Sequence, residues 1–137
     1  MLVERSVDGP VTTLRLNRPD RANAYDRATL EALDAALAAV ATPVAVIASA
    51  GDGAFCAGAD LKQMATADPL DALDLYSQAV FERLARAPWI SIAAVHGAAV
   101  AGGFELAMAC DLRVAGCLLY TSPSPRDQRG ARMPSSA

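Results

Sequence analysis

The stretch from Ser91 to Leu112, SIAAVHGAAVAGGFELAMACDL, constrains the fold of this chain more than any other segment. It begins with a continuous apolar run, passes through a turn of small residues, and continues into a helical pattern that opens on Gly102 and Gly103. A short apolar run without alternation is typical of a strand buried on both faces, as in a parallel sheet. The stretch therefore predicts a strand, a tight turn and a helix in succession.

The rest of the chain repeats this order after an initial hairpin. Asp8-Gly9-Pro10 separates two short β-branched segments, Asp26 can cap a helix, and Pro43 and Pro88 stop the helices before them. The predicted strands cover residues 2–7, 11–16, 44–48, 90–95 and 112–115, and the predicted helices cover 26–41, 68–87 and 102–109.

Apolar residues at helical spacing predict the core. In the first long helix they are Leu30, Leu33, Leu37 and Val40, and in the second they are Leu73, Tyr76, Val80, Phe81 and Leu84. Strands that alternate with helices after a hairpin predict an α/β fold with parallel crossovers.

Composition excludes several classes of protein. The chain has 137 residues, 53% of them hydrophobic, which suits one compact domain. Its net charge is −3, and residues 1–116 carry −5 because the last 21 residues contribute +2. This acidity argues against nucleic acid as a partner. No apolar run reaches the roughly 18 residues of a membrane span, and the first residues do not resemble a signal segment, so we expect a cytoplasmic protein.

The cysteines and the histidine do not predict a metal site. Cys56, Cys110 and Cys117 are odd in number, and neither they nor His96 show metal-ligand spacing. We expect small buried thiols and no bound metal.

The character of the chain changes at Cys117. The last 21 residues have no helical or strand period and hold three prolines and four serines. Their two ends, CLLYTSPSPRD and RMPSSA, resemble the translation of a transposase-type sequencing adapter. We therefore expect residues 1–116 to form the domain, residues 117–137 to be a disordered, artefactual tail, and the natural gene to continue beyond Gly116. A genuine disordered tail and a natural frameshift are the alternatives.

Two loops of small residues carry the chemistry that the sequence predicts. Residues 54–61 and 100–106 each follow a buried strand and run into a helix start, at the strand ends where open α/β sheets place their sites. Unpaired N–H groups at two facing helix starts can hold an oxygen that becomes negative. Glu105, one turn after Gly102, places a carboxylate beside them, which suits proton transfer next to a carbonyl.

Each feature also has a plain structural interpretation. A pair of glycines before a helix commonly serves close packing, and a glutamate in a first helical turn is commonly a surface residue that favours the helix dipole. The combination of the features points to a site.

That combination resembles the enoyl-CoA hydratase/isomerase family, also called the crotonase family. The resemblance spans residues 1–116. It is carried by Asn17-Arg18-Pro19 with Asn23-Ala24, by FCAGADLKQM at 55–64, and by IAAVHGAAVAGGFELAMACDL at 92–112. It implies a crotonase-like ββα spiral core, of which this chain would be the first, catalytic half.

The resemblance also implies residue roles and partners. The N–H groups of Ala59 and Gly102 would form an oxyanion hole for the thioester oxygen of an acyl-CoA, and Glu105 would be a catalytic acid/base. CoA would enter as part of the substrate, with no separate cofactor, and the full-length protein would be a homotrimer or hexamer. The residues expected to line the CoA and acyl chain are Ala22, Ala24, Ala57, Asp60, Leu61 and Lys62, with Lys62 approaching the phosphates.

One family feature is absent. Hydratases of the family pair the first glutamate with a second, and the corresponding position lies in or beyond the tail, which contains no glutamate. The resemblance implies an enoyl-CoA hydratase as the parent enzyme, and the missing second glutamate implies an inactive fragment. The alternatives are an enoyl-CoA isomerase, or a chain that binds acyl-CoA without turnover. A peptidase of the related Clp fold needs a serine nucleophile, and no serine stands at a suitable helix start.

Overall fold

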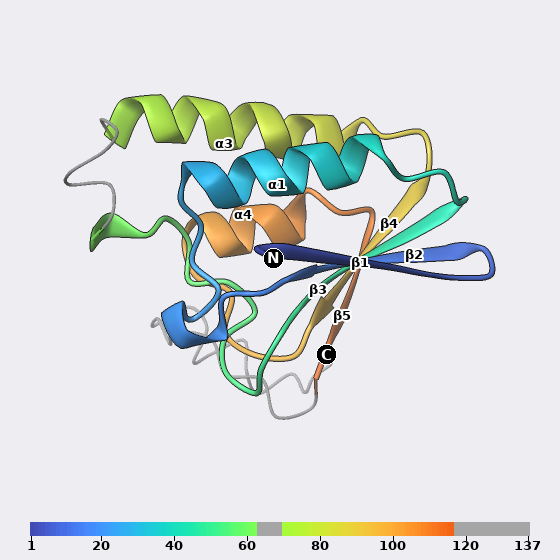
Figure 1. The fold of residues 1–137 in the computed structure, drawn as a ribbon, viewed down its shortest axis with the longest axis horizontal. Coiled ribbons are helices and arrows are strands. Elements are labelled where there is room, and N and C mark those ends of the chain that lie inside the picture. Colours follow the sequence, from blue (N-terminus) through green and yellow to red (C-terminus); the bar gives the residue numbers. More distant parts are fainter. Residues whose placement is uncertain (63–69, 117–137) are drawn as a thin grey trace, which may run out of the picture.

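The computed structural model describes residues 1–62 and 70–116, which form one layer of strands and one layer of helices (Figure 1). The strands β1 (Val3–Asp8), β2 (Val11–Leu16), β3 (Val44–Ser49), β4 (Ile90–Val95) and β5 (Leu112–Ala115) lie in the sheet in sequence order. β1 and β2 pair antiparallel as a hairpin, and all other neighbours pair parallel. The predicted α/β fold is confirmed.

The helices all cover the same face of this sheet (Figure 1). α1 (Arg27–Ala38) connects β2 to β3, α3 (Leu70–Ala85) connects β3 to β4, and α4 (Gly102–Met108) connects β4 to β5. Because the parallel strands follow one another in a single direction across the sheet, crossovers of one hand place every helix on one side.

The core lies between the two layers. Leu14, Ile47 and Ala93, from three neighbouring strands, are each at most 1% exposed, and they face the helices. The predicted helical stripes are buried against them at Leu30, Leu33, Leu37, Leu73, Val80, Phe81 and Leu84. The opposite face of the sheet carries Leu112 and Val114, which are exposed.

Several predicted bounds differ from the structure by one or two residues, as at the end of α3, which is Ala85 and not residue 87; two differences are larger. α1 ends at Ala38, with its last turn closed on Ala39. The prediction extended it to residue 41 because residues 38–41 contain no stop signal before Pro43. Pro19–Arg21, predicted as loop, forms a short 3-10 helix, η1. The predicted helix cap at Asp68 and the segment 117–137 lie outside the described residues.

Asp26 caps α1 as predicted. Its carboxylate accepts hydrogen bonds from the Thr29 N–H at 2.9 Å and the Thr29 hydroxyl at 2.7 Å. Partial burial would raise the pKa of Asp26, but these hydrogen bonds and nearby Arg18 outweigh it, so the pKa lies below its ordinary value.

Replacing Asp26 by Ala is expected to lower the free energy of unfolding by about 1 kcal/mol. Since the native pKa is depressed, this contribution is present above the unfolded pKa of about 4 and is lost as the pH falls through the native pKa. Urea unfolding of wild type and Asp26→Ala at pH 7 and at acid pH measures the difference. Asp52→Ala, at an exposed loop residue, is the control. A stability difference that grows on acidification would contradict the prediction.

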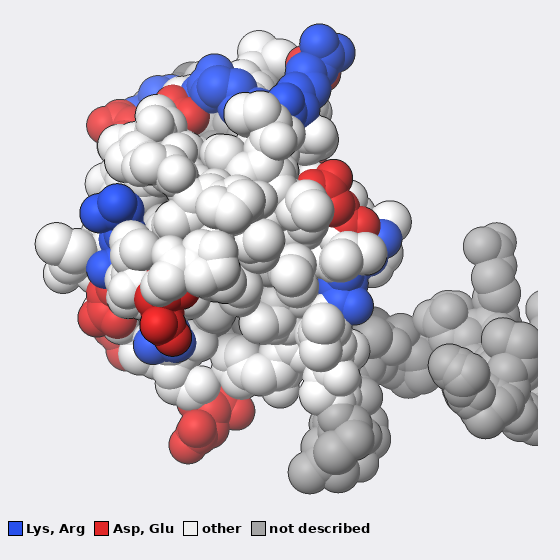
Figure 2. Space-filling model, turned by 90° about the vertical axis from the view of Figure 1, so that its right-hand side faces the viewer, with Lys and Arg blue, Asp and Glu red and all other residues white. Residues whose placement is uncertain are grey.

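Charges are mixed over the surface. On the side turned to the viewer in Figure 2, Lys and Arg side chains alternate with Asp and Glu around the rim, and the middle is uncharged. Among the described residues, none of the helices has the length and apolar character needed to cross a bilayer.

Candidate active site

Three connections gather at one end of the sheet. The segments that follow β2, β3 and β4 all leave the carboxyl ends of parallel strands, and Figure 1 shows them side by side. Parallel α/β sheets place their sites at this edge. The two predicted loops, residues 54–61 and 100–106, meet here.

Main-chain hydrogen bonds join the two loops directly. Phe55 and Cys56 donate their N–H groups to the Ala98 carbonyl at 2.9 and 3.2 Å, and Val100 donates to the Cys56 carbonyl at 3.1 Å. Cys56 and Ala99 also form a parallel bridge. The loops therefore behave as a short extension of the sheet.

Gly103 lets α4 begin against the first loop. A Cβ on Gly103 would lie 2.0 Å from the Cys56 carbonyl oxygen and 2.6 Å from its carbon, so only glycine fits without a backbone shift.

Replacing Gly103 by Ala is expected to cost about 1–3 kcal/mol of stability, because backbone atoms must move to admit the methyl group. Thermal unfolding compares it with Gly53→Ala, where the added Cβ meets nothing within 4 Å. We expect the control to stay within about 0.5 kcal/mol of wild type. Equal stability of the two variants would contradict the prediction, because it would show that the two loops move apart at little cost in free energy.

The predicted oxyanion donors lie in adjoining segments. A Cβ placed on Gly58 would lie 3.2 Å from the Gly102 nitrogen, so the residue before Ala59 contacts the start of α4. Neither the Ala59 N–H nor the Gly102 N–H donates a main-chain hydrogen bond to another described residue. Among the described residues, therefore, no main-chain acceptor occupies either donor.

Ala101 holds an unusual conformation immediately before the second donor. Its φ of 51° and ψ of −118° lie in a region that favours glycine. Backbone strain of this kind costs on the order of 1–3 kcal/mol and is typical of functional sites. This conformation turns the chain immediately before α4, so that Gly102 is the first residue of the helix.

Glu105 lies on the first turn of α4 and is exposed. Burial is the main cause that raises the pKa of Tyr25 to about 12, and the negative charge of Glu105 adds a smaller contribution; the hydroxyl of Tyr25 abuts Gly102. Glu105 and Gly102 thus lie on the same first turn of α4.

Asn23 belongs to a motif that carries the resemblance, but sequence reasoning gave it no role in the site. It is 1% exposed and has a left-handed φ of 55°. Its amide donates to the carbonyls of Ala50 and Ala54 at 3.0 and 2.9 Å, and its oxygen accepts from the Arg18 N–H at 2.9 Å. One side chain thus holds the loop after β2 against the loop after β3.

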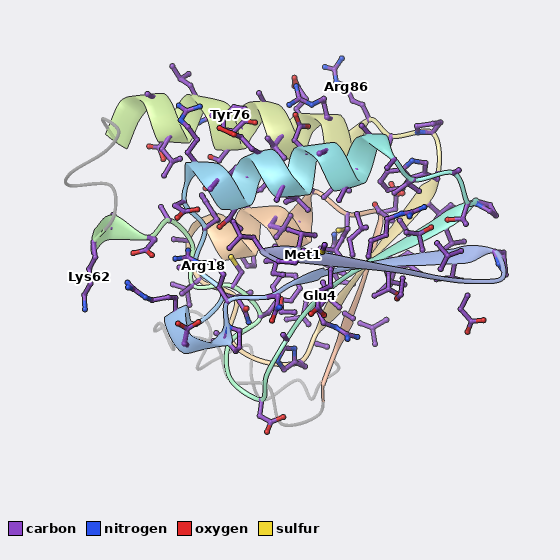
Figure 3. The ribbon with its side chains drawn as sticks, in the orientation of Figure 1. Met1, Glu4, Arg18, Lys62, Tyr76 and Arg86 are labelled. Carbon is purple, nitrogen blue, oxygen red and sulfur yellow. The ribbon has the colours of Figure 1, made fainter. Side chains whose placement is uncertain are left out.

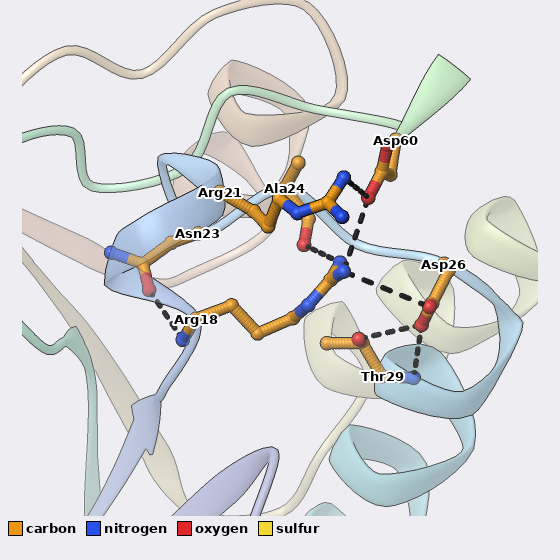
Figure 4. A network of polar contacts seen from close by, with 7 residues as sticks. All are labelled: Arg18, Arg21, Asn23, Ala24, Asp26, Thr29 and Asp60. Carbon is orange, nitrogen blue, oxygen red and sulfur yellow. Dashed lines mark hydrogen bonds and ion pairs between the residues drawn. The ribbon is translucent and has the colours of Figure 1, made fainter. Parts of the chain in front are cut away.

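Arg18 is the second such residue, and Figure 4 shows its contacts. Its guanidinium donates to the Ala24 carbonyl at 2.6 Å and to the Asp60 carboxylate at 3.1 Å, and lies 3.9 Å from Asp26. Arg21 approaches Asp60 at 3.8 Å. Arg18 and Asp60 are 8% and 6% exposed, so this is a buried ion pair.

The structure separates the predicted CoA-lining residues into two groups. Ala22 and Ala57 meet through a hydrogen bond of 3.1 Å from the Ala57 N–H, and Ala24 lies buried beside Arg18. Leu61 is 66% exposed and Lys62 is exposed, and Figure 3 shows Lys62 pointing away from the body. The Asp60 carboxylate is engaged by arginines.

Cys56 and Cys110 are buried free thiols, as predicted, and Cys117 lies outside the described residues. Burial raises the pKa of both Cys56 and Cys110 to about 11. No group of three potential metal-ligating side chains occurs among the described residues.

A separate groove of about 690 Å³ lies between the carboxyl-terminal ends of α1 and α3. Leu37, Val40 and Trp89 contribute apolar walls, with Arg83 and Arg86 at the rim. None of the candidate site residues lines it, so we do not include it in the site.

Comparison with known proteins decides the family. The family model described as enoyl-CoA hydratase/isomerase matches residues 7–117. The chain belongs to the enoyl-CoA hydratase/isomerase family. A short-chain-enoyl-CoA hydratase from Clostridium acetobutylicum is 34% identical over 114 residues, which are 79% of this chain and 44% of that protein.

Solved structures of the family share the fold. A Mycobacterium smegmatis enoyl-CoA hydratase superposes with a TM-score of 0.83 at 35% identity, over 93% of this chain and 52% of that one. A Thermobifida fusca structure in complex with acetoacetyl-CoA has a TM-score of 0.73 at 31% identity, over 88% and 52%. The chain spans about half the length of these members of the enoyl-CoA hydratase/isomerase family.

Proposed function

We propose that the protein to which this chain belongs is an enoyl-CoA hydratase, which adds water to a trans-2-enoyl-CoA thioester. The observation that carries the proposal is the pair of N–H groups at Ala59 and Gly102, which have no main-chain acceptor among the described residues, beside a glutamate one turn further on. Family members with a hydratase name support the choice of reaction.

The proposed roles follow from the chemistry of a conjugated thioester. When water attacks the β-carbon, the electrons of the double bond move towards the thioester oxygen, and two N–H donors stabilise that charge. Glu105 exchanges a proton with the water, and the α-carbon takes up a proton to complete the addition. Ala22, Ala24, Ala57, Asp60, Leu61 and Lys62 are proposed to line the CoA and acyl chain. CoA is substrate here, and no other cofactor takes part.

The test is an assay of the hydration of short trans-2-enoyl-CoAs, in which the fall in absorbance of the conjugated thioester measures the rate. It uses the chain as printed and the full reading frame of its source gene. We expect turnover by the latter and only binding by the former, because a concerted addition uses two carboxylates with separate roles. A full reading frame that isomerises 3-enoyl-CoAs and hydrates none would overturn the hydratase assignment in favour of the isomerase.

The other partners and the location stay predictions. We propose a homotrimeric or hexameric protein in the cytoplasm, and light scattering and cell fractionation measure the two properties. A monomeric mass at working concentration would contradict the first.

A further inference from the structure

Tyr25 contacts both of the segments that carry the proposed oxyanion donors. Its main chain pairs with the first loop: the Tyr25 N–H donates to the Gly58 carbonyl, and the Asp60 N–H donates to the Tyr25 carbonyl, both at 2.8 Å. Tyr25 and Ala59 thereby form a parallel bridge. The direction of the Ala59 N–H is fixed by bonds to Tyr25 on either side.

The side chain of Tyr25 reaches the second donor. A Cβ on Gly102 would lie 2.0 Å from the Tyr25 hydroxyl oxygen and 2.8 Å from the ring carbon that carries it. The hydroxyl therefore lies against the Gly102 main chain, and its position reserves the first residue of α4 for glycine.

Neighbours on α3 hold the ring of Tyr25 in place. Tyr25 is 5% exposed and packs edge to face against Phe81, with ring centroids 5.8 Å apart and planes at 89°. Burial raises the pKa of Tyr25 to about 12, and the nearby Ser77 side chain opposes this rise. The Ser77 hydroxyl donates to the Asp74 carbonyl at 2.9 Å.

We propose that Tyr25 is a positioning residue that sets the separation between the Ala59 and Gly102 N–H groups. The main chain anchors one donor, and the length of the phenol side chain spaces the other. This inference rests on the proposed function. Since donors act only at a defined distance from the developing charge, a small change in this spacing weakens the polarisation of the thioester carbonyl.

The test compares Tyr25→Phe with wild type in the full-length protein of the source gene. Phenylalanine keeps the packing against Phe81 and removes only the hydroxyl. We expect kcat to fall on the order of 10-fold, while binding of the CoA ester changes less than about 3-fold. A bound 3-arylpropenoyl-CoA reports the cause, because its absorption band moves to longer wavelength as the carbonyl is polarised. Tyr25→Phe should give a smaller shift.

Two further variants keep the result specific. Tyr76→Phe removes a hydroxyl from α3 at a ring that faces Arg27, and it should leave both kcat and the band shift unchanged. Ser77→Ala should reproduce the effect of Tyr25→Phe, and the double variant should be no worse than either single one. If Tyr25→Phe does not fold, Ser77→Ala carries the test.

Two outcomes overturn the inference in different ways. Equal band shifts and equal kcat for wild type, Tyr25→Phe and Ser77→Ala would overturn the positioning role and leave the proposed function standing. A wild-type protein that shows neither a band shift nor hydration would overturn both.

Discussion

Replacing Glu105 by Gln is expected to lower hydration by about 10²–10⁴-fold, the usual contribution of a positioned acid or base. Glutamine keeps the size and hydrogen-bonding shape of the side chain but cannot exchange a proton with water. Because the thioester oxygen is assigned to main-chain donors, binding of the substrate should change little. Steady-state kinetics of the full-length protein therefore should show a fall in kcat at nearly constant KM.

Glu82→Gln is the matched control for this prediction. This variant makes the same chemical change at an exposed position on α3, where the Glu82 carboxylate pairs with Arg86 at 3.6 Å. It should leave kcat unchanged. Glu105 itself is exposed, so its replacement should alter stability by no more than about 1 kcal/mol, the size of a helix-dipole effect. Full activity of Glu105→Gln would remove Glu105 from the proposed mechanism.

Replacing Arg18 by Met is expected to lower the free energy of unfolding by about 3–5 kcal/mol. The change leaves the buried Asp60 carboxylate with only Arg21, which is 44% exposed and 3.8 Å away. It also removes the donor to the Ala24 carbonyl. Urea unfolding monitored by fluorescence measures the loss.

Arg21→Met is the control that separates the effect of removing a positive charge from the effect of removing a buried ion-pair partner. It removes an arginine from the same carboxylate at an exposed position, where an ion pair contributes about 0–1 kcal/mol. In the double variant Arg18→Met/Asp60→Leu both buried charges are gone, so part of the lost stability should return. Additive losses in the double variant would show that the pair is not coupled.

The fold could be predicted because its signals are local. Apolar runs such as Val44–Ser49 and Ile90–Val95 mark the strands, although the expectation of burial on both faces was wrong, because helices cover only one face (Figure 1). The stripe Leu30, Leu33 and Leu37 marks the buried face of α1. The handedness of crossovers then places the helices on one side. The end of α1 was predicted too late, because alanine favours helix whether or not the helix continues.

The supports of the site could not be predicted in the same way. Arg18 and Asp60 are 42 residues apart, and their type indicates exposed charges until the fold brings them together. The sequence places Tyr25 next to the Asn23-Ala24 element but does not show that its hydroxyl reaches Gly102. Such contacts depend on how loops pack, which neither periodicity nor spacing records.

The two buried thiols, Cys56 and Cys110, can report on local opening of the structure. Cys56 lies where the two loops join, and Cys110 lies just beyond the end of α4, with its thiol 3.7 Å from the Leu106 carbonyl. A thiol with a pKa of about 11 is almost fully protonated at neutral pH and reacts slowly with alkylating reagents. With Cys117 replaced by Ser, the rate of alkylation at each cysteine would therefore measure how often its own region opens, without any added label.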